Sequence, residues 1–352
     1  MLTHNFSTNK LTYRLIVLLT YRLKKMEHLF NSFNEKKIMI VGDMMLDTYM
    51  NGKVERISPE APVPIVSVTT TFSRLGGAAN VAQNIKALGA EPILCSVIGQ
   101  DDKSNELISL MLEQNMNTSG IVRSNERITT NKVRIISNNA QMLRVDTEDT
   151  FDLTEKEYYS LISKITEILN KEKIDGIILQ DYNKGVLTET LIKEVIAIAN
   201  ENNIPVCVDP KKKNFLAYEN ATLFKPNLKE LKEGIGISSK DDSIEGIIKS
   251  VDLLQEKLNC RYIMTTLSER GVLIKDYATS TCHHIPAHLR KIADVSGAGD
   301  TVLSVAMLCL ASEQSAYNIA ALSNLAGGIV CEEVGVVPIN KEHLLEESKK
   351  IS

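Results

Sequence analysis

The chain has 352 residues, which is enough for one large domain or two small ones. Its 40 Lys and Arg residues nearly balance its 44 Asp and Glu residues, so the formal charge of −4 argues against a basic nucleic-acid-binding protein and against a polybasic membrane protein. With 43% hydrophobic and 24% charged residues, the composition is that of an ordinary globular protein and excludes general disorder.

Six cysteines are scattered along the chain without a C-x-x-C pair, so they do not form the framework of a disulfide-rich secreted protein. We therefore expect a reducing compartment, the cytoplasm. Cys282 and the histidines at 283, 284 and 288 match neither common zinc spacing, because Pro286 interrupts the helix that would align two of the histidines. A polar edge strand is favoured there over a metal site.

Residues 1–35 are predicted to be an N-terminal extension. The apolar run at 15–19 is too short for a transmembrane helix and lacks the cleavage site of a signal peptide. Two explanations stay open: residues 1–25 are a frayed extension, or translation begins at Met26, shortly before the first strand. Residues 36–352 are predicted to form a single domain.

The regular pattern begins at Ile38–Val41, an apolar run ended by Gly42 and Asp43 that predicts a buried strand. The run Gly-Gly-Ala-Ala-Asn at 76–80 predicts the start of a helix that ends near Gly89. The other predicted features of this half are β-rich stretches near 48–54 and 63–70, a stiff proline-rich segment at 58–64, a strand at 93–98, and a hairpin of strands 131–136 and 141–146 with its turn at Asn138 and Asn139.

From about residue 153, strands and helices alternate. Predicted helices cover 154–169, 188–202, a segment after Asn227, 242–258, 298–311, 315–332 and a charged final helix; predicted strands cover 174–179, 204–208, 221–224, 261–266 and a β segment at 271–285. Repeated strand–helix units indicate an α/β fold with a parallel sheet flanked by helices. The early β stretches break this rhythm and predict a small β lid formed by about 48–70 and 131–146.

Polar side chains stand where several predicted strands end: Asp43, Asp181, Asp209 and Asn227. In an open parallel sheet, ligands bind at the carboxyl ends of the strands, so these residues are candidates for a binding site. Lys211 lies on the same side and is a candidate for facing a phosphate, although a solvated run of lysines at 211–213 is the simpler explanation.

The segment 294–301, Asp-Val-Ser-Gly-Ala-Gly-Asp-Thr, opens a predicted helix. Its small residues leave backbone N–H groups free to approach an anion at the helix N-terminus. Asp300 follows directly, and a carboxylate beside a phosphate makes sense as a base that removes a proton from an attacking hydroxyl. A helix cap with a tight glycine turn remains the simpler alternative.

Three other nucleotide-binding patterns are absent from the sequence. It contains no G-x-x-x-x-G-K-[ST] and no G-x-G-x-x-G after the first strand, which argues against a P-loop protein and a dinucleotide dehydrogenase. The signature motifs of protein kinases are missing as well.

The two glycine-containing segments, 76–80 and 294–301, resemble the two signatures of the ribokinase-like (PfkB) sugar kinases. Five further segments resemble one branch, the D-glycero-β-D-manno-heptose 7-phosphate kinases, over about residues 36–340: 42–47, 56–64, 181–185, 209–211 and 226–230. The run Ser-Pro-Glu-Ala-Pro-Val-Pro at 58–64 is the most specific of them. The resemblance implies a ribokinase-like three-layer fold with a β lid.

It also implies roles at the reaction centre. Asp300 would be the catalytic base for the anomeric hydroxyl, and the backbone of Gly297, Ala298 and Gly299 would form the anion hole for the transferring phosphoryl group. The residues implied to contact the sugar are Asp43, Asp47, Gly76, Gly77 and Asn80. Those implied to bind the substrate phosphate are Lys184, Arg134 and Arg144, and those implied to bind ATP are Asn227, Leu228, Lys229 and Glu230. Glu230 would also help to hold Mg²⁺, through water. For Asp47, a turn cap is the alternative, and for the basic residues a solvated surface.

The resemblance further implies that the substrates are ATP and a small-molecule sugar phosphate. The product would enter ADP-heptose and lipopolysaccharide precursor synthesis. The resemblance also implies a homodimer in which two lids pair. Many relatives carry a nucleotidyltransferase domain, and since this chain contains no H-x-G-H we expect a separate protein to act downstream. The alternatives are another PfkB-type sugar or nucleoside kinase and, more remotely, a non-catalytic sugar- or nucleotide-binding protein.

Overall fold

A computed structural model of the chain describes residues 24–138, 140–236, 241–288 and 290–351. Within these residues, nine strands form the main sheet, in the order β13-β12-β11-β10-β9-β8-β1-β4-β5. Strands from β11 to β5 pair in parallel, and β12 and β13 continue the sheet antiparallel. The bounds are β1 Lys37–Gly42, β4 Glu91–Gly99, β5 Ile121–Ser124, β8 Gly176–Gln180, β9 Val206–Asp209, β10 Leu223–Phe224, β11 Tyr262–Thr266, β12 Val272–Asp276 and β13 Thr281–Ile285.

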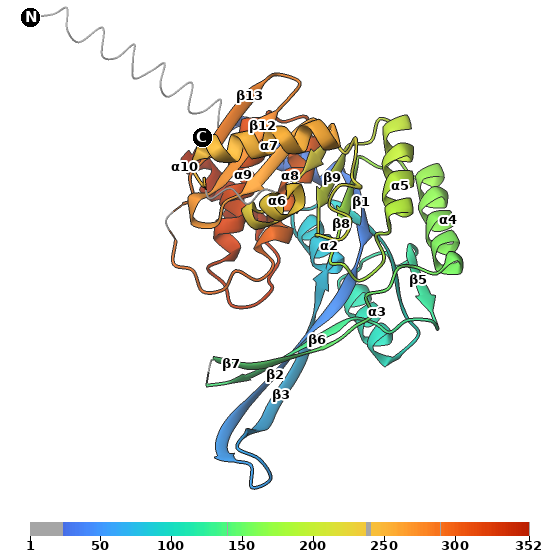
Figure 1. Cartoon of the computed structure of the whole chain (residues 1–352), viewed down its shortest axis with the longest axis vertical. Coiled ribbons are helices and arrows are strands. Elements are labelled where there is room, and N and C mark those ends of the chain that lie inside the picture. The colour runs from blue at the N-terminus through green and yellow to red at the C-terminus, as the bar shows by residue number, and fades with distance from the viewer. Residues whose placement is uncertain (1–23, 139, 237–240, 289, 352) are drawn as a thin grey trace, which may run out of the picture.

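Helices cover both faces of this sheet (Figure 1). Alternate residues of β1 face opposite sides, as the pleat requires: Ile38 and Ile40 pack with α2, α3, α8, α9 and α10, whereas Met39 and Val41 pack with α4, α5, α6 and α7. Burial on both faces explains why inner strands such as β1 and β8 are largely apolar runs. The bounds are α2 Ala78–Ala87, α3 Asp102–Glu113, α4 Glu155–Lys171, α5 Glu189–Glu201, α6 Leu228–Ile235, α7 Ile244–Leu258, α8 Ala298–Ala311, α9 Ala316–Val330 and α10 Lys341–Ile351.

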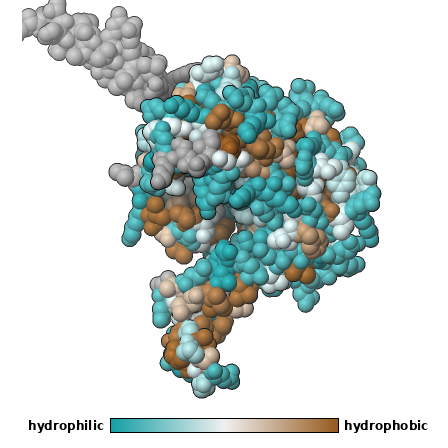
Figure 2. Space-filling view, viewed as in Figure 1, coloured by the Kyte–Doolittle hydropathy of each residue, from teal (hydrophilic) through white to brown (hydrophobic). Residues whose placement is uncertain are grey.

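A second sheet, which we call the lid, extends away from this three-layer body (Figure 1). Its order is β3-β2-β6-β7, with bounds β2 Met44–Ile57, β3 Pro64–Gly77, β6 Asn131–Ser137 and β7 Ala140–Thr147. Strands β2 and β6 pair in parallel and the other pairs are antiparallel. The side of the outer lid that Figure 2 shows is largely hydrophobic. The exposed hydrophobic residues of the lid strands include Val68, Phe72 and Leu143.

The predicted α/β fold with its lid is confirmed, but several elements differ from expectation. The lid strands are much longer than the predicted 48–54 and 63–70, and the proline-rich segment forms the tip of their hairpin. The β segment predicted at 271–285 consists of two strands, β12 and β13. Asn139 of the second predicted turn lies outside the described residues.

Helix α3 and the edge strand β5 were not predicted. A signal for α3 was available, because Asp101 and Ser104 form a capping box in which the Asp101 carboxylate accepts the Ser104 N–H at 2.7 Å.

The packed structure begins before the predicted boundary at residue 36. Residues 24–32 are helical, and the side chains of Leu29, Phe30 and Phe33 are buried in the core beside α8 and α9. No helix among the described residues is long and apolar enough to cross a membrane.

Candidate active site

Asp300 lies in the first turn of α8, 4% exposed, where three side chains from distant parts of the chain meet it. The Asn80 amide donates to one carboxylate oxygen at 2.7 Å. The other oxygen accepts from the Tyr182 hydroxyl at 2.8 Å and from the Gln180 amide at 3.2 Å. The carboxylate is thus oriented by α2, by the end of β8 and by the loop after β8.

Burial raises the pKa of Asp300 to about 6, and the nearby Asp209 carboxylate raises it as well. The hydrogen bonds from Asn80 and Tyr182, together with the Lys225 ammonium group, oppose this rise. At neutral pH the group is therefore mostly ionised, yet basic enough to accept a proton from a hydroxyl.

Gly297 precedes α8 with φ 81° and ψ −5°, in the left-handed region, and provides no side-chain cap for the helix. A Cβ atom at this position would lie 3.0 Å from the Asn80 Nδ2 atom. Because the first N–H groups of a helix have no partner within it, the backbone at Gly297, Ala298 and Gly299 can receive an anion next to Asp300. The Ala298 N–H would then exchange its long hydrogen bond to the Val295 carbonyl, 3.3 Å, for the anion.

Asp47 lies within β2, so the predicted alternative of a turn cap is wrong. Its carboxylate forms an ion pair with Arg134 of the neighbouring strand β6. Gly76 makes room for this carboxylate, since a Cβ atom there would lie 2.3 Å from Asp47 Oδ2, and Gly77 follows it directly before α2. The structure therefore brings Asp47, Arg134, Gly76 and Gly77 together where the lid joins the body.

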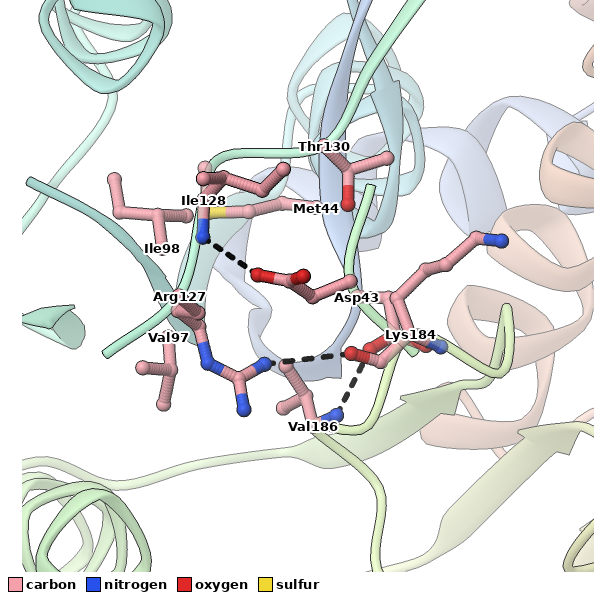
Figure 3. A pocket seen from close by; sticks show the side chains of 10 residues that line it. Asp43, Met44, Val97, Ile98, Arg127, Ile128, Thr130, Lys184 and Val186 are labelled. Carbon is pink, nitrogen blue, oxygen red and sulfur yellow. Dashed lines mark hydrogen bonds between the residues drawn. The ribbon is translucent and has the colours of Figure 1, made fainter. Parts of the chain in front are cut away.

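Asp43 has a different environment from the one expected for a sugar ligand. Its carboxylate is 1% exposed and accepts backbone N–H groups of Tyr182 at 2.8 Å, Lys184 at 3.0 Å and Val186 at 3.0 Å. Figure 3 shows Asp43 against this loop, beside a cavity of about 10 Å³ that Arg127 also lines. Asp43 thus fixes the loop that carries Tyr182 and Lys184.

Arg127 supports the same loop from the other side. Its guanidinium forms an ion pair with Glu157 at 2.8 Å, with both side chains 3% exposed, and donates to the Lys184 carbonyl at 3.3 Å. Burial raises the pKa of Glu157, but the hydrogen bonds from Arg127, Ser124 and Thr154 and the charge of Arg127 together outweigh it and lower this pKa to about 2.

Basic side chains gather where the lid meets the body. Lys184 pairs with Glu148 at 2.6 Å, and Lys132 of β6 lies over the Tyr182 ring at 5.5 Å. Burial lowers the pKa of Lys132, and so does the neighbouring Lys184 charge. Arg144 lies opposite Arg134 on β7, but it is half-exposed and pairs with Asp146 at 2.8 Å.

Asn227 is the N-cap of α6 and forms a capping box with Glu230: the Asn227 side chain accepts the Glu230 N–H at 2.8 Å, and Glu230 accepts the Asn227 N–H at 2.9 Å. The other Glu230 oxygen pairs with Lys211 at 2.5 Å. Leu228 and Lys229 fill the first turn, and the Lys229 side chain is 83% exposed. Glu230 and Lys211 thus form one charged pair beside the end of β9.

Sequence reasoning missed Gln180, Tyr182 and Lys225, and it gave Asp209 no role of its own. Lys225 and Asp209 form a buried ion pair at 3.1 Å. The only signal for these residues in the sequence was their place at the carboxyl ends of predicted strands. Gln180 and Asp209 are the last residues of β8 and β9, and Lys225 follows β10 directly.

Residues 35–342 match the model of the pfkB family carbohydrate kinases. The chain is 40% identical over 310 residues to the bifunctional protein HldE of Methylobacillus flagellatus, covering 88% of this chain and 62% of the relative. It is 38% identical over 300 residues to the bifunctional protein HldE of Helicobacter pylori strain G27, covering 85% of this chain and 64% of the relative. The chain therefore spans less than two thirds of the length of these relatives.

Two solved structures share the fold at low sequence identity. Phosphofructokinase-2 from Escherichia coli in complex with potassium superposes with a TM-score of 0.74 at 20% identity, covering 90% of this chain and 98% of that one. Arabidopsis thaliana ribokinase complexed with ribose and ATP gives a TM-score of 0.67 at 15% identity, covering 88% and 98%. The predicted ribokinase-like fold is confirmed.

Proposed function

Since the chain belongs to the pfkB family of carbohydrate kinases, we propose that it transfers the γ-phosphoryl group of ATP to the anomeric C1 hydroxyl of D-glycero-β-D-manno-heptose 7-phosphate. The products are heptose 1,7-bisphosphate and ADP. The observation that carries the proposal is the buried Asp300 carboxylate in the first turn of α8, directly after the backbone of Gly297–Gly299.

In the proposed reaction, Asp300 accepts the proton of the C1 hydroxyl as its oxygen forms a bond to the γ-phosphorus of ATP. The bond between that phosphorus and the β–γ bridging oxygen breaks, and ADP leaves with the electron pair. Backbone N–H groups at Gly297, Ala298 and Gly299 stabilise the charge on the transferring group, and positioning of the two substrates supplies much of the remaining rate.

The sugar is proposed to bind where the lid joins the body. Asp47, Asn80 and the backbone of Gly76 and Gly77 would contact sugar hydroxyls. A side chain at Gly76 would displace the Asp47 carboxylate. Asp43 was predicted to bind the sugar too, but with three backbone N–H groups on its carboxylate it is better placed to hold the 182–186 loop.

The 7-phosphate is proposed to bind among Lys132, Arg134 and Lys184, with Arg144 further out on the lid. Arg134 and Lys184 are each paired with a carboxylate, Asp47 and Glu148. A phosphate dianion carries more charge than either carboxylate and accepts several hydrogen bonds at once, so it can compete for these cations.

ATP enters as its magnesium complex and is proposed to lie against Asn227–Glu230. Mg²⁺ keeps several water ligands and is bound largely by the phosphates of its nucleotide, so Glu230 would accept hydrogen bonds from its water rather than replace it. Lys211, paired with Glu230, would face the phosphates from the same side.

We further propose one kinase domain over residues 36–352, extended by the preceding helical residues 24–32 that pack on it, a cytoplasmic location and a homodimer formed through the lids. The exposed hydrophobic side chains of the outer lid, including Val68, Phe72 and Leu143, favour pairing of two lids. The product would enter ADP-heptose synthesis for lipopolysaccharide, in which nucleotidyl transfer is a later step.

The test is phosphorylation by the purified protein with Mg-ATP, comparing the heptose 7-phosphate with the unphosphorylated heptose, fructose 6-phosphate and ribose. We expect a strong preference for the heptose phosphate, with the new phosphate on C1. Lys184→Met should raise KM for this substrate about tenfold or more, because a charge-assisted contact is lost. The matched control is Lys213→Met, since Lys213 also pairs with a carboxylate, Asp152, but at the exposed surface. Equal use of phosphorylated and unphosphorylated sugars would refute the proposed substrate.

A further inference from the structure

A buried ion pair that the proposed reaction does not use lies next to Asp300. The side chains of Lys225 and Asp209 are 4% and 7% exposed, and their charged atoms are 3.1 Å apart. A Cβ atom at Gly299 would lie 3.8 Å from Lys225 Nζ and 3.9 Å from Asp209 Oδ2, so the pair lies against the first turn of α8. Burying two charges is costly, and a fold gains little stability from such a pair. The position of this pair therefore suggests a role in the site.

Gln180 links the pair to Asp300. Its side-chain Nε2 lies 3.1 Å from Asp209 Oδ2 and 3.2 Å from Asp300 Oδ1, so one amide group donates to both carboxylates. The Gln180 Oε1 atom is buried and has no hydrogen-bond partner in the part of the chain that the structure describes. The amide is thus oriented by the two carboxylates, and a continuous series of polar contacts runs from Lys225 to Asp300.

We propose that Lys225, Asp209 and Gln180 act together as a positioning unit that sets the charge and the orientation of the Asp300 carboxylate. The proposal deepens the proposed function, since it rests on Asp300 being the base of the phosphoryl transfer. Asp209 holds the Gln180 amide on Asp300, and Lys225 compensates the Asp209 charge that would otherwise repel an ionised Asp300.

The two charged members act on Asp300 in opposite directions. The Asp209 carboxylate raises the pKa of Asp300 and the Lys225 ammonium lowers it. Two other groups donate hydrogen bonds to Asp300, the Asn80 amide from α2 and the Tyr182 hydroxyl. The Lys211 ammonium is more distant, and the charge of Asp300 contributes to the raised pKa of Lys211. Because these groups stay in place, single changes at Lys225 and Asp209 should shift the Asp300 titration with opposite signs.

The experiment compares Lys225→Met, Asp209→Asn and the double variant with wild-type protein. The first readout is the titration of Asp300 by NMR of ¹³C-carboxyl-labelled aspartate, with the resonance assigned by its loss in Asp300→Asn; it requires no substrate. The second readout is the pH profile of kcat with Mg-ATP and the heptose phosphate. Because all variants are assayed with the same two substrates, ionisation of the substrates affects every profile equally. Differences between the profiles therefore reflect ionisation of groups in the protein.

We expect the pKa of Asp300 to rise by about one unit or more in Lys225→Met and to fall by a similar amount in Asp209→Asn. The double variant should fall between the two, and the acid limb of the kcat profile should move with the NMR titration. Lys275→Met is the control, because it also breaks a lysine–aspartate pair, with Asp252, but between β12 and α7. It should leave the Asp300 titration unchanged.

Titrations of Asp300 that coincide in wild-type protein and Asp209→Asn would overturn the proposal, whatever the activity. If Lys225→Met does not fold, Lys225→Arg provides the complementary test: it keeps the charge and should keep the wild-type titration, and a rise of the pKa in this variant would count against the proposal. Opposite shifts by NMR without phosphorylation of the heptose phosphate would support the positioning unit and refute the proposed substrate.

Discussion

Replacing Asp300 by Asn should abolish catalysis and at the same time stabilise the protein. Asn has almost the same shape and cannot accept the proton of a hydroxyl, so kcat should fall by about three orders of magnitude or more, while ATP still binds. The stability effect follows from burial, because the pKa of Asp300 in the folded protein is about 6 against an ordinary value of 3.8. The folded state therefore pays a free-energy cost for keeping this group ionised.

The size of that cost follows from the shift. Each pKa unit corresponds to about 1.4 kcal/mol, so full ionisation destabilises the fold by roughly 3 kcal/mol. Asn avoids this cost, but its NH₂ group replaces an oxygen that accepts a hydrogen bond in wild-type protein. We take the resulting imperfect hydrogen bonding to cost about 1 kcal/mol. We expect Asp300→Asn to be about 2 kcal/mol more stable than wild-type protein at pH 7.5.

The pH dependence has a definite sign. Between pH 4 and 6 the folded protein binds the Asp300 proton more readily than the unfolded chain, so this group lowers the free energy of unfolding as pH rises through that window. The advantage of the variant should be complete above about pH 6 and absent below about pH 4. Urea denaturation at pH 7.5 and at pH 3.8, followed by circular dichroism, measures the gain and its loss.

The matched control is Asp276→Asn, which alters another buried aspartate. Asp276 is the last residue of β12 and pairs with Tyr262, the first residue of β11. It therefore lies at the opposite edge of the sheet from the carboxyl ends of the parallel strands. It should leave kcat close to the wild-type value. A kcat of Asp300→Asn within tenfold of wild type would refute the role of the base. A variant no more stable than wild type at pH 7.5 would refute the argument from burial.

Three further predictions concern the backbone and the loop beside the site. Gly297→Ala should lose about 1–2 kcal/mol of stability and most of kcat, measured by denaturation and ADP release, because φ is 81° and the new Cβ would press on Asn80 at 3.0 Å. Glu157→Gln should destabilise the fold by about 3–5 kcal/mol, since it leaves the Arg127 charge buried without a partner. In wild-type protein the stability that the ionised Glu157 contributes should fade as pH falls below about 4.5 toward 2, where Glu157 becomes protonated in the fold. Asp43→Asn should cost about 2–3 kcal/mol and raise KM for the sugar phosphate, because an amide cannot accept all three N–H groups of the loop.

Local patterns in the sequence were sufficient where one short segment determines its own structure. The helix predicted over 298–311 has the observed bounds of α8, because the glycine turn before it and the apolar run within it are both local signals. The same segment made Asp300 the candidate base. The predicted strand ends likewise placed Asp43, Asp181 and Asp209 at one edge of the sheet.

The remaining features depend on contacts between distant segments. The lid strands β2 and β3 were underestimated because much of their length is polar and pairs with neighbouring strands rather than packing in the core. Lys225 reads in the sequence as an ordinary lysine before a proline, and only the parallel pairing of β9 with β10 brings it to Asp209. Gln180 and Asp300 are 120 residues apart, so no local pattern could have revealed their contact.

The partners of the buried carboxylates distinguish Asp300 from the others at this edge of the sheet. Asp43 is held by three backbone N–H groups, and Asp181 by the Asn183 N–H and the hydroxyl of Tyr218, whose ring lies in the core. Those partners cannot withdraw without unfolding a loop or opening the core. Asp300 is bonded instead by the side chains of Asn80, Gln180 and Tyr182, and such bonds can be exchanged by rotation about side-chain torsions alone. A substrate hydroxyl can therefore replace one of these donors at low cost, which makes Asp300 the carboxylate suited to reaction, while Asp43 and Asp181 are suited to hold the loop around it.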